Sequence, residues 1–203
     1  MKKIDFKKNL KHLYKPSPKE VMMVNVPEMN FIMIDGMGDP NTSQEFQNAV
    51  EALFGVSYAL KFMIKKGQQG IDYGVLPLEG LWWADDMSQF NVGNKDDWKW
   101  TLMIMQPEWI TMALFNRAID QVNKKKGLVS LSKLHFSSYN EGKSAQIMHV
   151  GPFSEEGPTV DKIHQFIEDQ GSKISGKHHE IYLKDFRRTA PEKLQTIIRQ
   201  PMR

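Results

Sequence analysis

The sequence predicts an α+β fold made of two similar halves, each a strand, a helix and two further strands. Three observations predict it. Short apolar runs with period-two alternation recur along the chain, longer stretches carry apolar residues at helical spacing, and the order of these elements is the same in both halves. Because so short a repeat cannot bury its own sheet face, we expect the two repeats to form antiparallel sheet and pack about a pseudo-twofold axis.

The bulk composition is that of a globular protein. The chain has 203 residues, 40% of them hydrophobic, which is enough for one large domain or two small halves that share a core. The net charge is +3 and the basic residues are dispersed, so nothing argues for direct nucleic-acid binding. The absence of cysteine fits a reducing compartment. With no signal peptide and no apolar run of membrane-spanning length, we expect a soluble, cytoplasmic protein without membrane contact.

The first half begins after an arm. Residues 1–20 form a lysine-rich arm or short helix that Pro16 and Pro18 end. Strands are expected at 21–26 and 31–34, an extended segment at 73–83 and a strand at 98–105. A helix is expected at 43–65, where Thr42 can cap its start and Glu45 can reciprocate.

The second half follows a connecting helix at about 108–126. Strands are expected at 128–139 and 143–150, joined by a turn at Asn140-Glu141-Gly142. A helix at about 158–169 follows, then strands at 178–183 and 194–199. The predicted organisation is therefore a single domain over 21–203, with repeats at about 21–107 and 128–203.

Three pairs of segments support the repeat, in the same order in each half. Residues 31–36 resemble 146–151, residues 101–107 resemble 196–201, and 77–81 fall opposite 178–182. This comparison matches Glu79 with Glu180. If the duplication is real, the two acids should approach one shared groove from opposite sides.

Glu180 is an acid within a short strand. Alternation places Glu180 and Tyr182 on one face of the strand, and His179, Ile181 and Leu183 on the other. A buried carboxylate is costly unless it is paired, and its raised pKa suits it to bind cations or handle protons. The alternative is an edge strand with Glu180 in water.

Aromatic residues supply the walls that a pocket for a flat, apolar or cationic molecule needs. Trp82 and Trp83 are adjacent, so alternation sends one to each face of the sheet. The other ligand-contacting candidates are Tyr58, Trp109 and Phe153. His149 lies on a strand before a glycine and is either a hydrogen-bonded residue of the core or pocket rim, or a catalytic base. His178 and His179 point to opposite faces and Gly36-x-Gly38 lacks a third glycine, so no metal and no cofactor is expected.

Several of these segments together resemble the GyrI-like small-molecule-binding domain. They are Glu141-Gly142, the run from Gln146 to Pro152, the run from His178 to Leu183, Pro191 to Leu194 and Thr196 to Pro201. The resemblance extends from about Val21 to the C-terminus, and Pro77 to Trp83 resembles a stand-alone bacterial branch of the family. It implies two strand-helix-strand-strand repeats around a ligand cleft with a central glutamate at Glu180, as in the effector-binding domains of multidrug-sensing regulators. It also implies that some stand-alone members hydrolyse the cyclopropane ring of DNA-alkylating toxins.

Two functions share this predicted site. In the first, Glu180 supplies a negative charge and the aromatic residues stack on small hydrophobic, planar or cationic xenobiotics, for sequestration or detoxification. In the second, the protein is a hydrolase in which Glu180 places or deprotonates a water, and Tyr139, Tyr182 or Glu79 bonds the oxygen that becomes charged. About 20 residues precede the first strand, too few for a helix-turn-helix module. A third reading, a protein-interaction module acting on gyrase, is an analogy with the gyrase inhibitor of the family. The oligomeric state does not follow from the sequence.

Overall fold

The chain divides into two compact units, and this computed structural model describes residues 2–85 and 95–203. The first unit holds residues 2–6, Met29–Leu76 and the described part of Trp83–Tyr139. The second holds Lys7–Glu28, Pro77–Trp82 and Asn140–Arg203. These units do not coincide with the predicted repeats, because Pro77–Trp82 leaves the first half of the sequence and joins the second unit.

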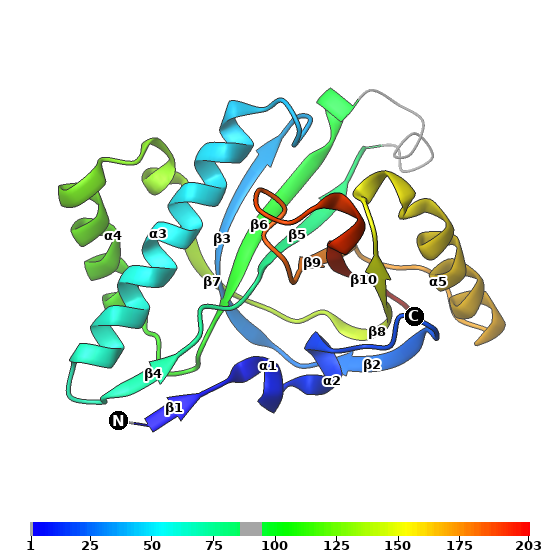
Figure 1. The fold of residues 1–203 in the computed structure, drawn as a ribbon, viewed down its shortest axis with the longest axis horizontal. Coiled ribbons are helices and arrows are strands. Elements are labelled where there is room, and N and C mark those ends of the chain that lie inside the picture. Colours follow the sequence, from blue (N-terminus) through cyan, green and yellow to red (C-terminus); the bar gives the residue numbers. More distant parts are fainter. Residues whose placement is uncertain (1, 86–94) are drawn as a thin grey trace. The chain divides into compact units, whose positions relative to one another are not determined.

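The first unit contains a three-stranded antiparallel sheet in the order β6-β3-β7 among its described residues. Two helices, α3 and α4, pack on one another and α3 also packs on β3 and β6 (Figure 1). A short strand β1 pairs in parallel with β4. The bounds are β1 Lys2–Ile4, β3 Met29–Met37, α3 Gln44–Lys66, β4 Ile71–Tyr73, η2 Lys95–Asp97, β6 Lys99–Gln106, α4 Met112–Lys126, η3 Val129–Lys133 and β7 His135–Tyr139, with α1 Phe6–Asn9 beginning where this unit's first segment ends.

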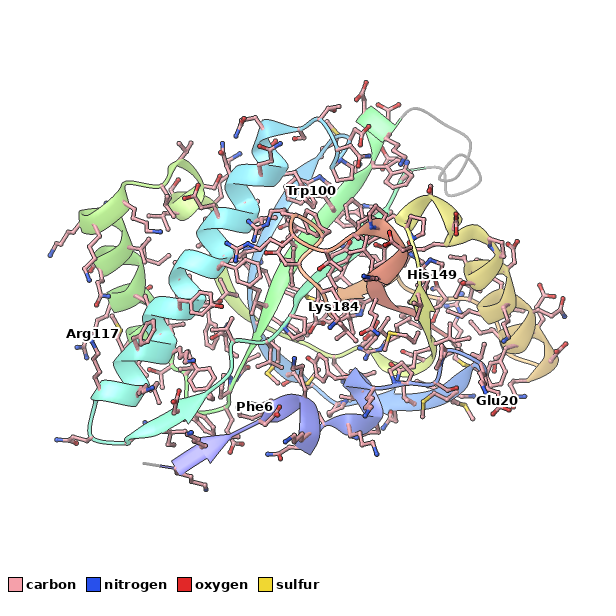
Figure 2. All side chains as sticks on the ribbon, in the orientation of Figure 1. Phe6, Glu20, Trp100, Arg117, His149 and Lys184 are labelled. Atoms are coloured by element: carbon pink, nitrogen blue, oxygen red, sulfur yellow. The ribbon has the colours of Figure 1, made fainter. Side chains whose placement is uncertain are left out.

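Helix α3 begins one residue later than the sequence predicts. The side chain of Ser43, not Thr42, accepts the capping hydrogen bond, from the backbone N–H of Phe46 at 3.2 Å. The helix then packs Phe46 against Trp100 of β6, with ring centroids 5.4 Å apart. Trp100 is fully buried and is labelled in Figure 2. Gly36 on β3 makes room for that indole, since a Cβ there would lie 2.1 Å from a Trp100 ring carbon.

The second unit is a five-stranded antiparallel sheet in the order β2-β8-β10-β9-β5. Helix α5 lies along β8 and β10, and α2 lies near β2 (Figure 1). The bounds are α2 Lys11–Tyr14, β2 Met22–Val26, β5 Leu78–Trp83 (of which Trp83 belongs to the first unit), β8 Gly142–Val150, η4 Phe153–Glu155, α5 Gly157–Asp169, β9 His178–Tyr182, η5 Pro191–Lys193 and β10 Gln195–Pro201.

The two faces of this second sheet are covered differently. On one face, here named the α5 face, Ile163 and Ile167 of α5 pack on the buried side chains of Ala145, Ile147 and Ile198. The other, the α2 face, is closed by the chain around α2, because β8 and β10 side chains donate hydrogen bonds to the carbonyls of residues 12 and 13. Cross-strand register assigns every sheet side chain to one face or the other, since directly paired residues share a face.

The predicted order strand, helix, strand, strand is confirmed in both halves, as β3-α3-β5-β6 and β8-α5-β9-β10, with β4 added in the first. Helices α4 and α5 begin within a few residues of the predicted 108 and 158. The continuous strand at 128–139 is wrong, because Val129–Lys133 is a 3₁₀ helix and only His135–Tyr139 is extended. The predicted hairpin is also wrong, since β7 pairs with β3 whereas β8 pairs with β2 and β10. Within residues 2–85 and 95–203, no helix is long and apolar enough to cross a lipid bilayer.

Candidate ligand-binding site

Strand β9 alternates as the sequence predicts and carries Glu180 on the α5 face. His178, Glu180 and Tyr182 share this face, while His179 and Ile181 lie on the α2 face. Tyr182 donates its hydroxyl to Glu180 Oε2 at 2.8 Å, and His178 Nε2 lies 3.2 Å from Glu180 Oε1. The Glu180 side chain is 16% exposed, so it is neither sealed in the core nor free in water. A carboxylate in this position is held in place and still open to a ligand.

Trp82 and Tyr182 form a chain of donors that ends at Glu180. Trp82 Nε1 donates to the Tyr182 hydroxyl oxygen at 3.0 Å, and that hydroxyl donates onward to Glu180. Burial, followed by the negative charge of Glu180, raises the pKa of Tyr182 well above its ordinary value. Tyr182 therefore keeps its proton at neutral pH and acts as a donor, not as a base.

Gly80 lets these two side chains approach the sheet. It is the cross-strand partner of Glu180. A Cβ built on Gly80 would lie 2.7 Å from Trp82 Nε1 and 3.1 Å from the Tyr182 hydroxyl oxygen. The missing side chain therefore provides the space in which the indole and the phenol lie beside the carboxylate, a role that the sequence analysis did not recognise.

Two phenylalanine rings pack on Tyr182. Phe153 and Phe186 both meet Tyr182 edge to face, with ring centroids 5.7 and 6.2 Å apart, and they contact one another at 6.2 Å. Phe153, at the start of η4, is 39% exposed, so part of this cluster faces solvent. Phe153 is among the ligand-contacting residues predicted from the sequence, whereas Phe186, in the loop after β9, is not. Ring faces beside a carboxylate are suited to a lipophilic cation or a planar aromatic molecule.

Glu156 is a second acid on this face that the sequence analysis missed. It precedes α5 and is 7% exposed. Burial, followed by the negative charge of Glu180, raises the pKa of Glu156 to about 9, against a hydrogen bond with Thr196 that lowers it. At neutral pH Glu156 is therefore a protonated acid close enough to Glu180 to feel its charge.

His149 has protein partners on both ring nitrogens. Nε2 lies 3.2 Å from the carbonyl oxygen of Pro152, which only accepts, so Nε2 carries the proton and Nδ1 accepts from the Thr159 hydroxyl at 3.0 Å. Pro152 precedes η4 and Thr159 lies in the first turn of α5, so these bonds fix the connection from β8 to α5. The geometry favours the core reading of His149, and its ligand role stays a prediction without support.

Glu79 lies on the α2 face, opposite to Glu180. Its cross-strand partner is Ile181, whereas that of Glu180 is Gly80. The expectation that the two acids approach one groove from opposite sides is therefore wrong. The alignment of the two repeats matches Glu79 with Glu180, but in the β5–β9 register the residue opposite Glu180 is Gly80. An error of one residue moves a side chain to the other face of the sheet. A ligand role for Glu79 stays a prediction that this geometry does not support.

A closed network of charges surrounds Glu79. Glu79 is fully buried, accepts from the Tyr14 hydroxyl at 2.8 Å and lies 3.0 Å from His179 Nε2. His179 Nδ1 lies 2.8 Å from Glu141 Oε1, and Arg199 Nη1 donates to Glu141 Oε2 at 3.0 Å. Two acids therefore face one guanidinium and one imidazole inside the protein, so the charges on this face are matched.

The remaining predicted site residues belong to the first unit. Tyr139 meets Phe31 edge to face at 6.4 Å, and Tyr58 is an exposed residue of α3 that packs on Phe54. Trp109 precedes α4 and contacts Phe6 and Tyr73, with ring centroids 5.6 and 6.2 Å apart. Trp83 is half-buried at the end of β5 whereas Trp82 is buried, so the adjacent tryptophans have different environments, as alternation predicts. Contact of Trp83, Trp109, Tyr58 and Tyr139 with a ligand stays a prediction.

An antiparallel sheet with a helix along one face, and an acid beside aromatic rings on that same face, is the arrangement of a ligand-binding α+β domain. A model of the GyrI-like small-molecule-binding domain matches residues 19–203, and the chain belongs to that family. The resemblance noted in the sequence is thereby confirmed.

Solved structures of other proteins resemble this chain. A hydrolase encoded by lin2189 from Listeria innocua shares 42% identity and a TM-score of 0.90 with this chain, with 100% of both chains covered. A conserved protein of the same organism shares 42% identity and a TM-score of 0.90 over 98% of this chain and 100% of its own. The C-terminal domain of EcmrR, at 11% identity and a TM-score of 0.55 over 91% of this chain and 97% of its own, shares the fold. No curated protein matches the chain.

Proposed function

We propose that the chain binds small lipophilic cations and planar aromatic xenobiotics at Glu180, and that it removes them by sequestration. The observation that carries this proposal is the contrast between the two faces of one strand pair. On the α2 face each buried acid has a cationic partner, whereas on the α5 face Glu180 has no lysine or arginine partner among the described residues. Within residues 2–85 and 95–203, the one ion-pair candidate of Glu180 is His178.

A partly exposed carboxylate without a strong cation beside it is a site for a cation from outside. Loss of water from the carboxylate is costly unless an opposite charge or hydrogen bonds replace that water. Phe153 and Phe186 flank Tyr182, so a lipophilic cation gains ring contacts as well as the charge of Glu180. Binding through one charge and ring contacts needs few directional polar groups, which supports loose selectivity among lipophilic cations.

The test is the substitution Glu180→Gln, with the lipophilic cation tetraphenylphosphonium as the probe. We expect the affinity measured by calorimetry to fall at least about tenfold, because the charge is lost while the side-chain shape is kept. The melting temperature should hold or rise, since a carboxylate without a strong partner no longer has to be desolvated.

The matched control is Glu168→Gln, which removes the same charge from an exposed position on α5. It should leave the affinity within about twofold, since an exposed charge is screened by solvent. Equal affinity of the Glu180→Gln protein and the unmodified protein would remove Glu180 from the binding site.

A second candidate, hydrolysis of a strained alkylating ring, is favoured by the relative from Listeria innocua that is called a hydrolase. In this reaction Glu180 accepts a proton from water and the water oxygen bonds to the ring carbon. The ring carbon–carbon bond breaks, and its electron pair moves to a conjugated carbonyl oxygen, which takes up a proton. The ring strain lowers the barrier, so a positioned water and a base are what the protein has to supply.

Incubation with a cyclopropanoid alkylator in water enriched in heavy oxygen separates the two functions. Hydrolysis predicts a ring-opened product that carries one heavy oxygen atom by mass spectrometry, and the Glu180→Gln protein should form it at least about a hundredfold more slowly. Recovery of the intact compound in a stoichiometric complex would instead identify sequestration and exclude hydrolysis.

A further inference from the structure

Glu156 occupies the position before a helix but does not cap it. A carboxylate there commonly accepts a hydrogen bond from the first backbone N–H groups. In α5 no side chain caps the helix start, although Glu156 is the residue in place to do so. Its Oε1 is buried and has no hydrogen-bond partner among the described residues. An orphaned polar atom in a buried position is costly, so Oε1 is open to a hydrogen-bond partner that the described protein residues do not supply.

The surroundings of Glu156 leave it neutral. Thr196 of β10 makes a hydrogen bond with it, and Thr196 lies on the α5 face as the cross-strand partner of Tyr182. The titratable groups on the strands of this face are His178, Glu180 and Tyr182 on β9 and His149 on β8. From α5, His164 lies near enough to His178 for their charges to interact. His149 already has two partners, and no described lysine or arginine pairs with Glu156. Burial and the charge of Glu180 therefore keep the proton on Glu156 at neutral pH.

We propose that Glu156 is a neutral hydrogen-bond donor that recognises an acceptor oxygen on the ligand that Glu180 binds. The inference rests on the proposed function and deepens it, because it defines the ligand by two features instead of one. The preferred ligand has an aromatic body with a cationic or electron-poor centre for Glu180, and it also has a carbonyl or similar acceptor for Glu156. In the hydrolytic alternative, the same acid is placed to give its proton to the carbonyl oxygen that receives the electron pair of the broken bond.

The test compares two probes that differ in one acceptor. Tetraphenylphosphonium has none, and an analogue with one phenyl group replaced by acetylphenyl has a carbonyl. We expect the unmodified protein to bind the acetylphenyl probe about fivefold to tenfold more tightly at about pH 7, the effect of one hydrogen bond to a buried donor. Glu156→Leu should lose this preference, so that its affinities for the two probes lie within about twofold of one another.

Glu156→Gln provides the second variant, because its amide keeps a neutral donor and no longer titrates. It should retain the preference for the acetylphenyl probe at about pH 7 and at about pH 10, whereas the unmodified protein should lose the preference at about pH 10 as Glu156 ionises. If Glu156 acts in folding alone, its substitution would change the affinities for both probes by the same factor. The ratio of the two affinities is therefore the informative quantity.

The proposal is overturned if the unmodified protein does not prefer the acetylphenyl probe, or if Glu156→Leu keeps the preference. It is also overturned if Glu156→Gln weakens tetraphenylphosphonium as strongly as Glu180→Gln does, since Glu156 would then be an ionised ligand residue. Failure of the underlying function gives a different result, in which Glu180→Gln changes the affinity of neither probe.

Discussion

At the scale of single residues, Glu180 and Glu156 show two outcomes of burying an acid on one sheet face. Glu180 keeps partners that donate to it, Tyr182 and His178, and about a sixth of its side chain stays exposed. Glu156 is more deeply buried beside that charge, and it responds by holding its proton. Glu156 is therefore a neutral acid beside the charge of Glu180 at neutral pH.

Gly80 is the residue whose role is tested most simply by adding one methyl group. Gly80→Ala should push the indole of Trp82 away, because that indole is 3% exposed and its Nε1 lies 2.7 Å from the added Cβ. We expect a stability loss of about 1–3 kcal/mol and an affinity for tetraphenylphosphonium that falls at least about fivefold as the bond from Trp82 to Tyr182 is lost. Thermal melting and calorimetry measure the two effects.

Gly74→Ala is the control, because a Cβ at Gly74 meets nothing within 4 Å. Gly74→Ala should change neither the stability nor the affinity for tetraphenylphosphonium. An unaltered affinity in the Gly80→Ala protein would show that the Trp82 and Tyr182 pair does not shape the site.

The residue-scale predictions from sequence succeeded where the signal was local. The alternation that places Glu180 with Tyr182, and separates Trp82 from Trp83, is visible within one strand. Glu156 was missed because an acid before a helix is ordinarily explained by capping. Around Glu141 the sequence predicts a turn, and no local pattern shows that this acid pairs with His179 and Arg199 far away in the sequence.

At the scale of elements, the α2 face of the β5, β9, β10 and β8 strands is a charge network that ties the chain around α2 to the sheet. Arg199 donates to Gln146, Glu141 and the carbonyl of Leu13, and Gln146 donates to the carbonyl of His12. Burial alone would lower the pKa of His179, but attraction to Glu141 and hydrogen bonds to Glu141 and Glu79 raise it to about 9. Burial alone would raise the pKa of Glu141, but attraction to His179 and Arg199 and hydrogen bonds with both lower it to about 2.

These shifts predict the pH dependence of folding stability. The His179 contribution, of the order of 3 kcal/mol, is fully present below about pH 6.5 and is lost as pH rises through about 9. The Glu141 contribution is fully present above about pH 4.5 and is lost as pH falls toward about 2. Glu156 adds a further loss between about pH 4.5 and 9, since its proton is held in the folded state and released in the unfolded one.

His179→Gln isolates the histidine part of this profile. Denaturant unfolding from about pH 6 to 9.5 should show a lower stability at about pH 6 and a shallower alkaline decline than in the unmodified protein. His135→Asn, at an exposed position on β7, should leave the profile unchanged. Parallel profiles for the His179→Gln and unmodified proteins would show that His179 is not charged in the folded state.

Element boundaries were predicted well where caps and periodicity agreed, and badly where they did not. The start of α3 moved by one residue because the N–H groups of both Thr42 and Ser43 bond to the carbonyl of Asp39, which completes a turn before the helix. Val129–Lys133 alternates apolar and polar residues as a strand does, yet it forms a 3₁₀ helix that buries Ser130 and Leu131. Alternation over so few residues fits both structures, so packing decided between them.

At the scale of the whole molecule, the order of elements was predictable and the faces of the sheet were not. The recurring strand, helix, strand, strand pattern is a property of the sequence that survives small errors of alignment. Which face a residue occupies depends on strand register, and an error of one residue reverses it, as it did for Glu79. The predicted first repeat, at about 21–107, includes the segment Pro77–Trp82, but in the structure this segment belongs to the second unit.

The central claim is that ligand binding belongs to the α5 face and structural charge pairing to the α2 face. It is tested most directly by measuring the affinity of Glu180→Gln and Glu79→Gln proteins for tetraphenylphosphonium. We predict at least about tenfold weaker binding for Glu180→Gln, and binding within about twofold of the unmodified protein for Glu79→Gln, which should instead melt at a lower temperature because His179 loses a buried partner. Weakened binding in the Glu79→Gln protein together with unchanged binding in the Glu180→Gln protein would contradict the claim.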